Sequence, residues 1–419
     1  MSRAAIQKIP SKRVGVIWNA LGSTTYAANS FIMLIAVSQL ASIEEVGYYG
    51  IAYTIGYLLH VLGGLGAERL QMTDYKGRFA FADYLWLRIV ACAIAAVICL
   101  GLALQESDLW LKVFFIIVLS AYYLIVCMGE LYQAAAIRLE RLDLSGQAVF
   151  FRTLISTAGF CLVLFLTRRV ELAMLAMFAL CLLAYLYFNM HRMKGLVDPA
   201  RAFNFANIKK LIGECLPLFG SLILSNLILS SSRFVIEYSM DSTAQGYFTQ
   251  IFLPVFAINM ISNFFLIPSL SDYGRFLESG DMHAFWRRVF RQVTIVATIT
   301  LCSLLLAYFA GIPILNLVYG GDIAAYKTEL LLIIAGGGIL AITTLLQYLL
   351  IILRLQSRLL LVYALVVILS FGIALGLIGS LGLLGASLAF IASYLILLLG
   401  FLGILLSALR TRVKERSAS

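Results

Sequence analysis

Charged residues are scarce in this sequence. They make up 12% of its 419 residues, whereas a soluble domain carries about 25%. Hydrophobic residues reach 62%, and runs of about 20 apolar residues, the length that crosses a bilayer, recur along the whole chain. The short alternating segments of a membrane β-barrel are missing. The sequence therefore predicts an all-α polytopic membrane protein.

Motifs of enzyme chemistry are also missing. There is no G-x-x-x-x-G-K-[ST] loop for a nucleotide, and the seven cysteines include no C-x-x-C pair. All seven lie in apolar runs, which is typical of small buried hydrophobic residues. His60, His191 and His283 show no metal-ligand spacing. We therefore expect no catalytic residue, no cofactor and no metal, and the connections between apolar runs are too short for an extramembrane domain.

Twelve spans with both termini in the cytoplasm are predicted. With the N-terminus inside, 26 of the 31 lysines and arginines lie in or beside inside connections, as the positive-inside rule requires. The net charge of +10 then reflects attraction to anionic membrane lipids rather than nucleic-acid binding. The spans lie near residues 14–40, 46–66, 84–104, 110–136, 147–167, 171–190, 211–236, 246–270, 290–312, 328–352, 359–379 and 384–408.

Two short motifs occur twice along the chain. "GS" at Gly22 precedes "GYY" at Gly47, and "GS" at Gly220 precedes "GYF" at Gly246. The offset of about 198 residues pairs the first span with the seventh and the second with the eighth. This repeat predicts two pseudo-symmetric six-helix bundles, residues 1–200 and 205–419, related by an axis along the membrane normal. Such an architecture is typical of alternating-access transporters, whose substrate lies between the halves.

Polar side chains form stripes on three of the spans. Residues spaced i, i+4, i+7 and i+11 share one face of a helix. The stripes predict a wet, substrate-binding cavity; alternatively, these groups bond between packed helices, and Arg233 simply pairs with Glu237. The stripes consist of Asn19, Ser23, Tyr26 and Ser30, then Asn226, Ser230, Arg233 and Glu237, then Asn259 and Asn263.

Ionisable residues inside the spans are candidates for function, because each costs about 2.5–3.5 kcal/mol on insertion scales. Glu130 can pair with Arg88 or Arg152, and both arginines lie near cytoplasmic span ends, where they can also snorkel. His60 titrates near neutral pH, so it is either a packing residue or a proton-coupling residue. Prolines favour kinks that suit gating. The coupling or gating candidates are His60, Glu130, Arg152, Pro217 and Pro254.

Four segments carry a resemblance to a known family. "VGYYGIAYTIGYLL" opens the second span, and "LYQAAAIRLERLD" joins the fourth to the fifth. "ILNLVYGGDIAAYKTELLLIIAGGG" joins the ninth to the tenth, and "LGLLGASLAFIASYL" lies in the last. In order and spacing these segments resemble the multidrug/oligosaccharidyl-lipid/polysaccharide exporter (MOP) superfamily. The resemblance covers the whole chain in span number, half-length and orientation.

The resemblance implies a choice among three branches. Peptidoglycan-precursor flippases of the superfamily usually carry fourteen spans, and multidrug extruders carry a carboxylate in the first span. This chain has twelve predicted spans and no such carboxylate. The polysaccharide (Wzx-type) flippases favour cationic cavities for a polyprenyl (pyro)phosphate that bears a glycan. Arg69, Arg233 and Arg275 fit that cargo, and the Asn, Ser and Tyr stripes fit its sugar hydroxyls.

The resemblance therefore implies a flippase for lipid-linked oligosaccharide in a bacterial inner membrane, serving O-antigen or other cell-surface polysaccharide. Its expected partners are the lipid-linked glycan, membrane lipids and other polysaccharide-assembly membrane proteins, but no nucleic acid. A cation-coupled multidrug extruder of the same superfamily is the alternative. A second alternative is a membrane-embedded glycan polymerase. The acidic residues of the outside loops, however, are too scattered for the acid–base chemistry of such an enzyme.

Overall fold

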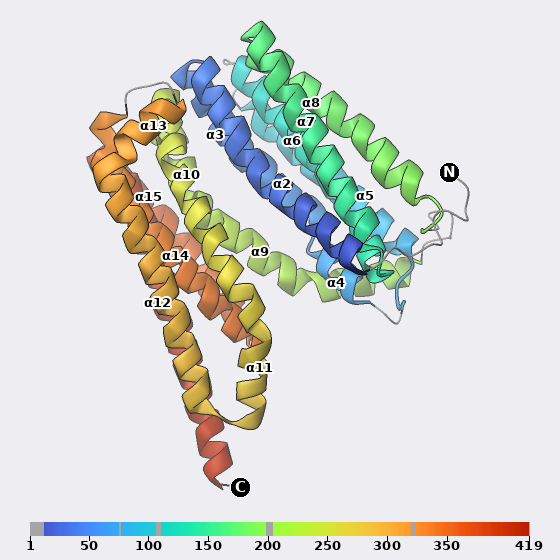
Figure 1. Ribbon diagram of the computed structural model, residues 1–419, viewed down its shortest axis with the longest axis vertical. Coiled ribbons are helices and arrows are strands. Elements are labelled where there is room, and N and C mark those ends of the chain that lie inside the picture. The colour runs from blue at the N-terminus through green and yellow to red at the C-terminus, as the bar shows by residue number, and fades with distance from the viewer. Residues whose placement is uncertain (1–11, 75–76, 106–109, 198–203, 320–322, 419) are drawn as a thin grey trace. The chain divides into compact units, whose positions relative to one another are not determined.

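The computed structural model describes residues 12–74, 77–105, 110–197, 204–319 and 323–418, and these are helical almost throughout (Figure 1). Ten of the helices are long and apolar enough to cross a membrane, and the bent pair of α3 (Ile43–Gly64) and α4 (Ala67–Thr73) adds an eleventh candidate. The described residues contain no strand. The expected class, an all-α polytopic membrane protein, is confirmed.

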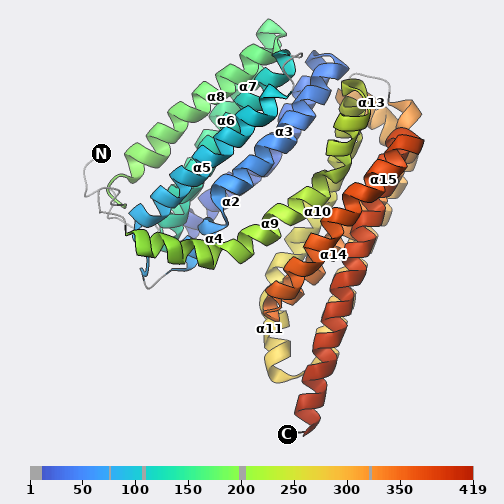
Figure 2. The ribbon, with the colours of Figure 1, turned by 180° about the vertical axis from the view of Figure 1, so that it is seen from behind.

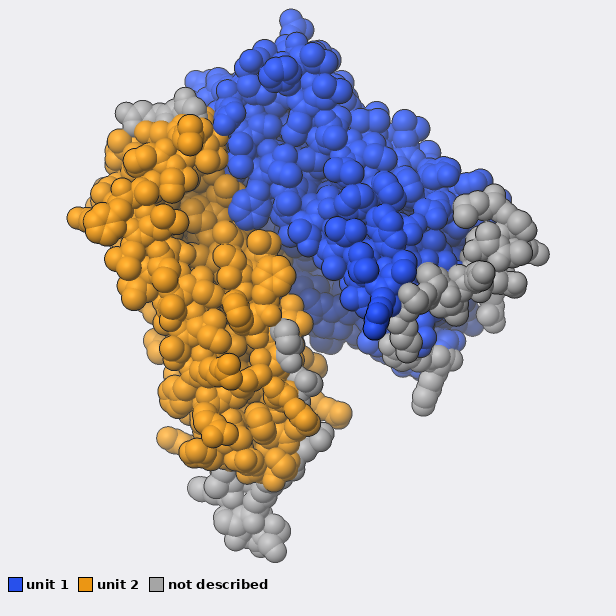
Figure 3. All heavy atoms as spheres, viewed as in Figure 1, with its two compact units in different colours: residues 1–223 blue, residues 224–419 orange. Residues whose placement is uncertain are grey.

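The chain divides into two compact units, residues 1–223 and residues 224–419 (Figure 3). The division falls inside α9 (Phe205–Ser239), the predicted seventh span. Residues 198–203, where the sequence places the connection between its two bundles, lie outside the described residues. The other helices that begin in unit 1 are α2 (Lys12–Leu40), α5 (Phe81–Leu104), α6 (Trp110–Arg138), α7 (Leu142–Thr167) and α8 (Val170–Ala184), which the π-helical η1 (Tyr185–His191) extends.

Unit 2 contains the second half of α9 and the remaining helices. Two of them, α11 and α13, are short segments that follow spans and were not predicted from the sequence. The helices are α10 (Ser242–Leu266), α11 (Leu270–Ser279), α12 (Met282–Leu306), α13 (Ile312–Tyr319), α14 (Lys327–Ile352) and α15 (Gln356–Ala418), with the short turns η2 (Ile267–Ser269), η3 (Ala307–Gly311) and η4 (Ala324–Tyr326) between them.

The long α15 is a hairpin of two helices. Gly382 interrupts it with φ +58° and ψ −133°, a conformation open to glycine because it has no Cβ. Across the turn, the rings of Tyr363 and Phe401 lie 5.2 Å apart, and Figure 2 shows the two arms side by side. The arms match the predicted spans 359–379 and 384–408. If α15 counts as two spans and the pair of α3 and α4 counts as one, the ten candidates become the twelve predicted spans.

The "GS" motif of the first span has a packing role in the structure. Gly22 of α2 lies against Gly146 of α7, and a Cβ added at Gly22 would lie 2.7 Å from the carbonyl oxygen of Gly146. A Cβ at Gly146 would in turn lie 2.3 Å from the backbone of Trp18. Small residues allow such backbone-level contact between membrane helices. This contact fixes α2 on α7 and leaves the neighbouring Ser23 exposed.

Candidate functional site

The first polar stripe lies on an accessible face of α2. Asn19 and Ser23 are exposed, and Tyr26 and Ser30 are partly buried. The hydroxyl oxygens of Ser30 and Tyr53, which lies on α3, are 3.2 Å apart. The structure thus brings the Ser30 end of the stripe together with a tyrosine of α3. The Asn19 end stays exposed.

Asn29, which directly precedes Ser30 in α2, is buried and forms hydrogen bonds to two neighbouring helices. Its Nδ2 donates to the Tyr122 hydroxyl at 3.4 Å, and its Oδ1 accepts a hydrogen bond from Thr157. These bonds join α2 to α6 and α7. Asn29 therefore bonds between packed helices, which was the alternative role considered for the polar stripes. The stripe residues themselves stay at or near the surface of unit 1.

A row of aromatic rings on α3 continues this polar face. Tyr53 and Tyr57 stack with centroids 6.3 Å apart and planes 4° from parallel, and Tyr57 stacks on His60 at 5.8 Å. Tyr123 of α6 lies edge-on to both tyrosines, at 5.7 and 6.0 Å. This row was not predicted from the sequence, although the i, i+4, i+7 spacing of Tyr53, Tyr57 and His60 indicates a shared helix face.

The row ends at a buried ionic cluster. His60 Nε2 lies 3.2 Å from Oε1 of Glu130, and Arg88 Nη1 lies 3.5 Å from its Oε2. Arg88 is 2% exposed, so it is buried in protein and does not snorkel. The alternatives left open for Glu130 are thus resolved, because Arg88 of α5 forms the ion pair and His60 of α3 completes it.

Arg152 enters the same interior from α7. It is 2% exposed, and a Cβ added at Gly129 of α6 would lie 1.9 Å from its Nη1. Asn189 Nδ2 donates to the Gly129 carbonyl at 3.1 Å. Glycine at position 129 therefore leaves room for the guanidinium, which is packed against the α6 backbone and, like Arg88, does not snorkel.

In unit 2, the stripe of α9 carries a buried cation. Arg233 is 6% exposed, and its guanidinium carbon lies 4.7 Å from the ring centroid of Phe252 and 6.0 Å from that of Phe256. Both rings belong to α10. A guanidinium at this distance from an aromatic face is attracted by the ring quadrupole. Ser230, one turn earlier, is also buried, and Asn226 is half-buried.

The third stripe offers unused acceptors. The side-chain oxygens of Asn259 and Asn263, one turn apart on α10, are buried and accept no hydrogen bond from the described residues. A buried acceptor without a donor costs about 1–3 kcal/mol. Pro254 lies inside the same helix. These two amides can therefore accept hydrogen bonds from a ligand that carries hydroxyl groups.

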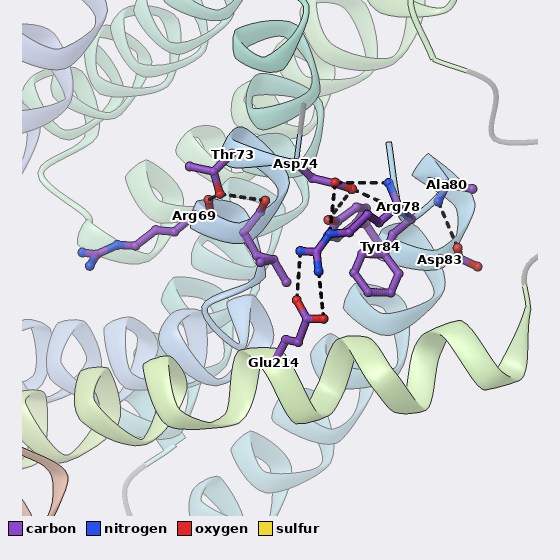
Figure 4. A network of polar contacts seen from close by, with 10 residues as sticks. Arg69, Thr73, Asp74, Arg78, Ala80, Asp83, Tyr84 and Glu214 are labelled. Carbon is purple, nitrogen blue, oxygen red and sulfur yellow. Dashed lines mark hydrogen bonds and ion pairs between the residues drawn. The ribbon is translucent and has the colours of Figure 1, made fainter. Parts of the chain in front are cut away.

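Two further predicted cations lie on short helices. Arg69 of α4 and Arg275 of α11 are both exposed, and each short helix follows one member of the repeat pair α3 and α10. Arg275 is bound by Asp272, which also lies 2.9 Å from Arg288. Arg275 therefore shares the Asp272 carboxylate with a second arginine. In Figure 4, Arg69 points away from the ion pair that Arg78 and Glu214 form nearby.

That ion pair belongs to a polar network that fastens α9 to the segment before α5 (Figure 4). Arg78 donates to both oxygens of Glu214, at 3.1 and 3.0 Å, which raises the pKa of Arg78 further above its usual value. Asp83 accepts from the backbone of Asn204 at 2.9 Å. Pro217 follows Glu214 by less than one turn and lies at the surface. The network thus holds the first half of α9 within unit 1.

Comparison with known proteins identifies the fold. No family model and no curated protein sequence matches the chain. Among solved structures, the lipid II flippase MurJ in an inward closed conformation aligns with a TM-score of 0.66 and 13% identity, over 92% of this chain and 87% of that one. An inward-facing multidrug resistance MATE transporter of the MOP superfamily aligns with a TM-score of 0.63 and 13% identity, over 98% of both chains.

A third structure is a MOP superfamily transporter from Pyrococcus furiosus whose binding pocket has reversed polarity. It aligns with a TM-score of 0.60 and 14% identity, over 95% of this chain and 96% of that one. All three alignments cover most of each chain, and the three proteins are a lipid II flippase, a multidrug resistance transporter and a further MOP superfamily transporter. This chain therefore has the fold of the MATE and MurJ transporters.

Proposed function

We propose that this protein is a flippase that moves a polyprenyl-(pyro)phosphate-linked oligosaccharide across a bacterial inner membrane by alternating access. The observation that carries this proposal is the polar face of unit 1. There, hydroxyl groups of α2 lie beside the stacked rings of Tyr53 and Tyr57, and α2 itself contains no Asp or Glu. Hydroxyls that bond to sugar hydroxyls and rings that pack on apolar sugar faces suit a glycan.

Unit 2 carries further polar groups that suit such a cargo. Arg233 is a cation held on aromatic rings, and a guanidinium binds phosphate oxygens through paired, charge-assisted hydrogen bonds. The free amide oxygens of Asn259 and Asn263 accept hydrogen bonds from hydroxyl groups. The lipid tail needs no protein path, because hydrocarbon is its natural solvent. A protein that transports such a cargo therefore has to provide polar groups for the phosphate and the glycan alone.

The two predicted bundles, residues 1–200 and 205–419, are the halves that alternate in this proposal, with both termini in the cytoplasm. The helix α9 links the compact units and carries Pro217. Because proline removes one helical hydrogen bond, it lowers the cost of bending there. The lipid II flippase with a similar fold supports lipid-linked cargo, and O-antigen or another surface polysaccharide precursor is the class we favour.

A multidrug extruder is the second candidate, because MATE transporters share the fold and unit 1 contains the acidic residue Glu130. A carboxylate that attracts a cationic drug should carry an uncompensated charge. Glu130 instead lies within 3.2 Å of His60 and 3.5 Å of Arg88. Its negative charge is already neutralised by Arg88, which disfavours the extruder.

Deletion of the gene in its native host tests the two candidates together. The flippase proposal predicts that lipid-linked glycan accumulates on the cytoplasmic face, that surface polysaccharide is lost, and that sensitivity to cationic drugs is unchanged. Normal surface glycan together with drug hypersensitivity would instead establish the extruder. Complementation with the wild-type gene serves as the control for effects on neighbouring genes.

A further inference from the structure

We propose that His60, Cys92, Cys127 and Glu130 form a binding site for a thiophilic divalent metal ion, Zn²⁺ above all, inside unit 1. The four side chains come from α3, α5 and α6. Their positions in the sequence show no metal-ligand spacing, so only the packing of three helices brings them together. This site is separate from the proposed transport of glycan and does not depend on it.

Two distances between the ligand atoms match those of a tetrahedral site. The sulfur atoms of Cys92 and Cys127 lie 3.9 Å apart. Zinc–sulfur bonds of about 2.3 Å in a tetrahedron separate two sulfurs by about 3.8 Å. Nε2 of His60 and Oε1 of Glu130 lie 3.2 Å apart, where bonds of about 2.0–2.1 Å predict about 3.3 Å. Ligand atoms of His60, Cys127 and Glu130 all lie within 4.8 Å of one another, and Cys92 lies beside this group of three through its contact with Cys127.

The surrounding groups orient these ligands. Nδ1 of His60 lies 3.2 Å from the carbonyl oxygen of Tyr123, so Nδ1 carries the proton and donates it. In a neutral imidazole, Nε2 then keeps its lone pair toward Glu130 and Cys127. Such a backbone bond to the second ring nitrogen is the usual support for a metal-binding histidine. The described structure thus already selects the tautomer that a metal requires.

Arg88 supports the two anionic ligands. Its Nη1 donates to the carbonyl of Cys127 and lies 3.4 Å from the sulfur of the same residue. A neighbouring guanidinium favours the thiolate, which is the form that binds metal. Arg88 contacts Oε2 of Glu130, while Oε1 faces His60. One carboxylate oxygen is therefore held by Arg88 and the other is left for a metal.

Charge balance favours a divalent ion in this apolar interior. Two thiolates and the Glu130 carboxylate carry three negative charges, and Zn²⁺ with the Arg88 guanidinium carries three positive charges. A buried cluster without net charge avoids most of the cost of burying an ion. The Glu130 side chain is 18% exposed, so an ion reaches the cluster from the Glu130 side. Once bound, it ties α3, α5 and α6 together.

Cobalt binding to the purified full-length protein tests this site directly. The protein is treated with a chelator in detergent and titrated with Co²⁺, because a cobalt–thiolate complex absorbs through charge transfer in the near ultraviolet. We expect this absorption to saturate at one ion per chain and to disappear when Zn²⁺ is added. Cys92→Ser and Cys127→Ser should each remove most of it, and Arg88→Met should weaken binding about 10–100-fold as a supporting residue.

Cys99→Ser is the matched control, since Cys99 lies buried on the same helix as Cys92 and contacts the Ile116 carbonyl of α6 rather than the cluster. Its cobalt spectrum should equal that of the wild type. Size-exclusion profiles report whether each variant remains folded without metal. Absence of thiolate absorption in the folded wild type, or absorption that survives both Cys92→Ser and Cys127→Ser, would overturn the proposal and leave the cluster as an ion pair of His60, Arg88 and Glu130.

Discussion

The two units bury charge in different ways. Unit 1 buries cations together with acids, as in the cluster of Arg88 and Glu130. Across the described part of unit 2, Arg233 is the one buried charged side chain, and its guanidinium carbon lies over aromatic rings of α10. The repeat that relates the halves in sequence therefore does not extend to their buried charges.

This difference suggests a division of tasks. Partnered charges in unit 1 cross-link α3, α5 and α6, and breaking such a buried pair is expensive. Arg233 carries its hydrogen-bond donors at the edge of a planar guanidinium, which suits paired contacts with phosphate oxygens. We therefore expect the ionic cluster of unit 1 to respond to mutation through stability and Arg233 of unit 2 to respond through transport.

Glu130→Ala should have the largest effect. It leaves His60 and Arg88 buried without their shared carboxylate, and removal of one partner of a buried ion pair costs about 3–5 kcal/mol. Membrane abundance and the thermal midpoint of the purified protein should both fall sharply. Glu44→Ala at the exposed start of α3 is the control, and equal behaviour of the two variants would show that the cluster is not stabilising.

Arg233→Ala should separate transport from stability in unit 2. A desolvated cation–π contact is worth about 2 kcal/mol, so the folded protein should persist at near-normal abundance. Export of lipid-linked glycan should nevertheless fall steeply, because the variant loses the proposed phosphate-binding group. Arg233→Lys should recover part of the export, since it keeps the charge but not the planar fork. Full export by the Ala variant would reduce Arg233 to a packing residue.

Replacement of both Asn259 and Asn263 by leucine should change stability and transport in opposite directions. Each amide oxygen is buried without a donor, so removal should stabilise the folded protein by on the order of 1 kcal/mol per site. Export should decrease, because the proposed acceptors for sugar hydroxyls are gone. The two readouts are thermal melting and surface glycan, and a loss of stability would indicate partners that these oxygens acquire in the membrane.

The smallest effect is expected at the ion pair of Arg78 and Glu214. Arg78 is exposed, and exposed ion pairs contribute little because water and salt screen them. Arg78→Glu should leave the thermal midpoint nearly unchanged and slightly alter transport, since it loosens α9 from its anchor. The charge-swapped double variant Arg78→Glu with Glu214→Arg should restore transport. A large effect of the single change on stability would contradict this view of the network.

The sequence predicted the helical class and the spans well, because long apolar runs alone specify membrane helices. It missed α4, α11 and α13, which are short helices that follow spans. The hairpin at Gly382 was expected as two spans, and the positive φ of that glycine explains how the chain reverses within so few residues.

The candidate site was predictable along single helices but not across them. Spacing on one helix predicted that Ser30 and Arg233 lie on polar stripes, and the structure places the two residues in the helices α2 and α9. Spacing cannot show that His60, Arg88 and Glu130 meet, because three helices have to pack before their side chains touch. For the same reason, the sequence suggested that Arg88 and Arg152 snorkel, whereas both are buried among neighbouring helices.

The central claim, transport of a lipid-linked glycan, is tested most directly by purified protein in liposomes. A polyprenyl-diphosphate-linked oligosaccharide with a fluorescent glycan is placed in both leaflets, and an added glycosidase removes the label from the outer leaflet only. The account predicts that wild-type protein lets nearly all of the label become cleavable, whereas protein-free and Arg233→Ala vesicles stop at about half. Wild-type vesicles that stop at the same half would contradict it.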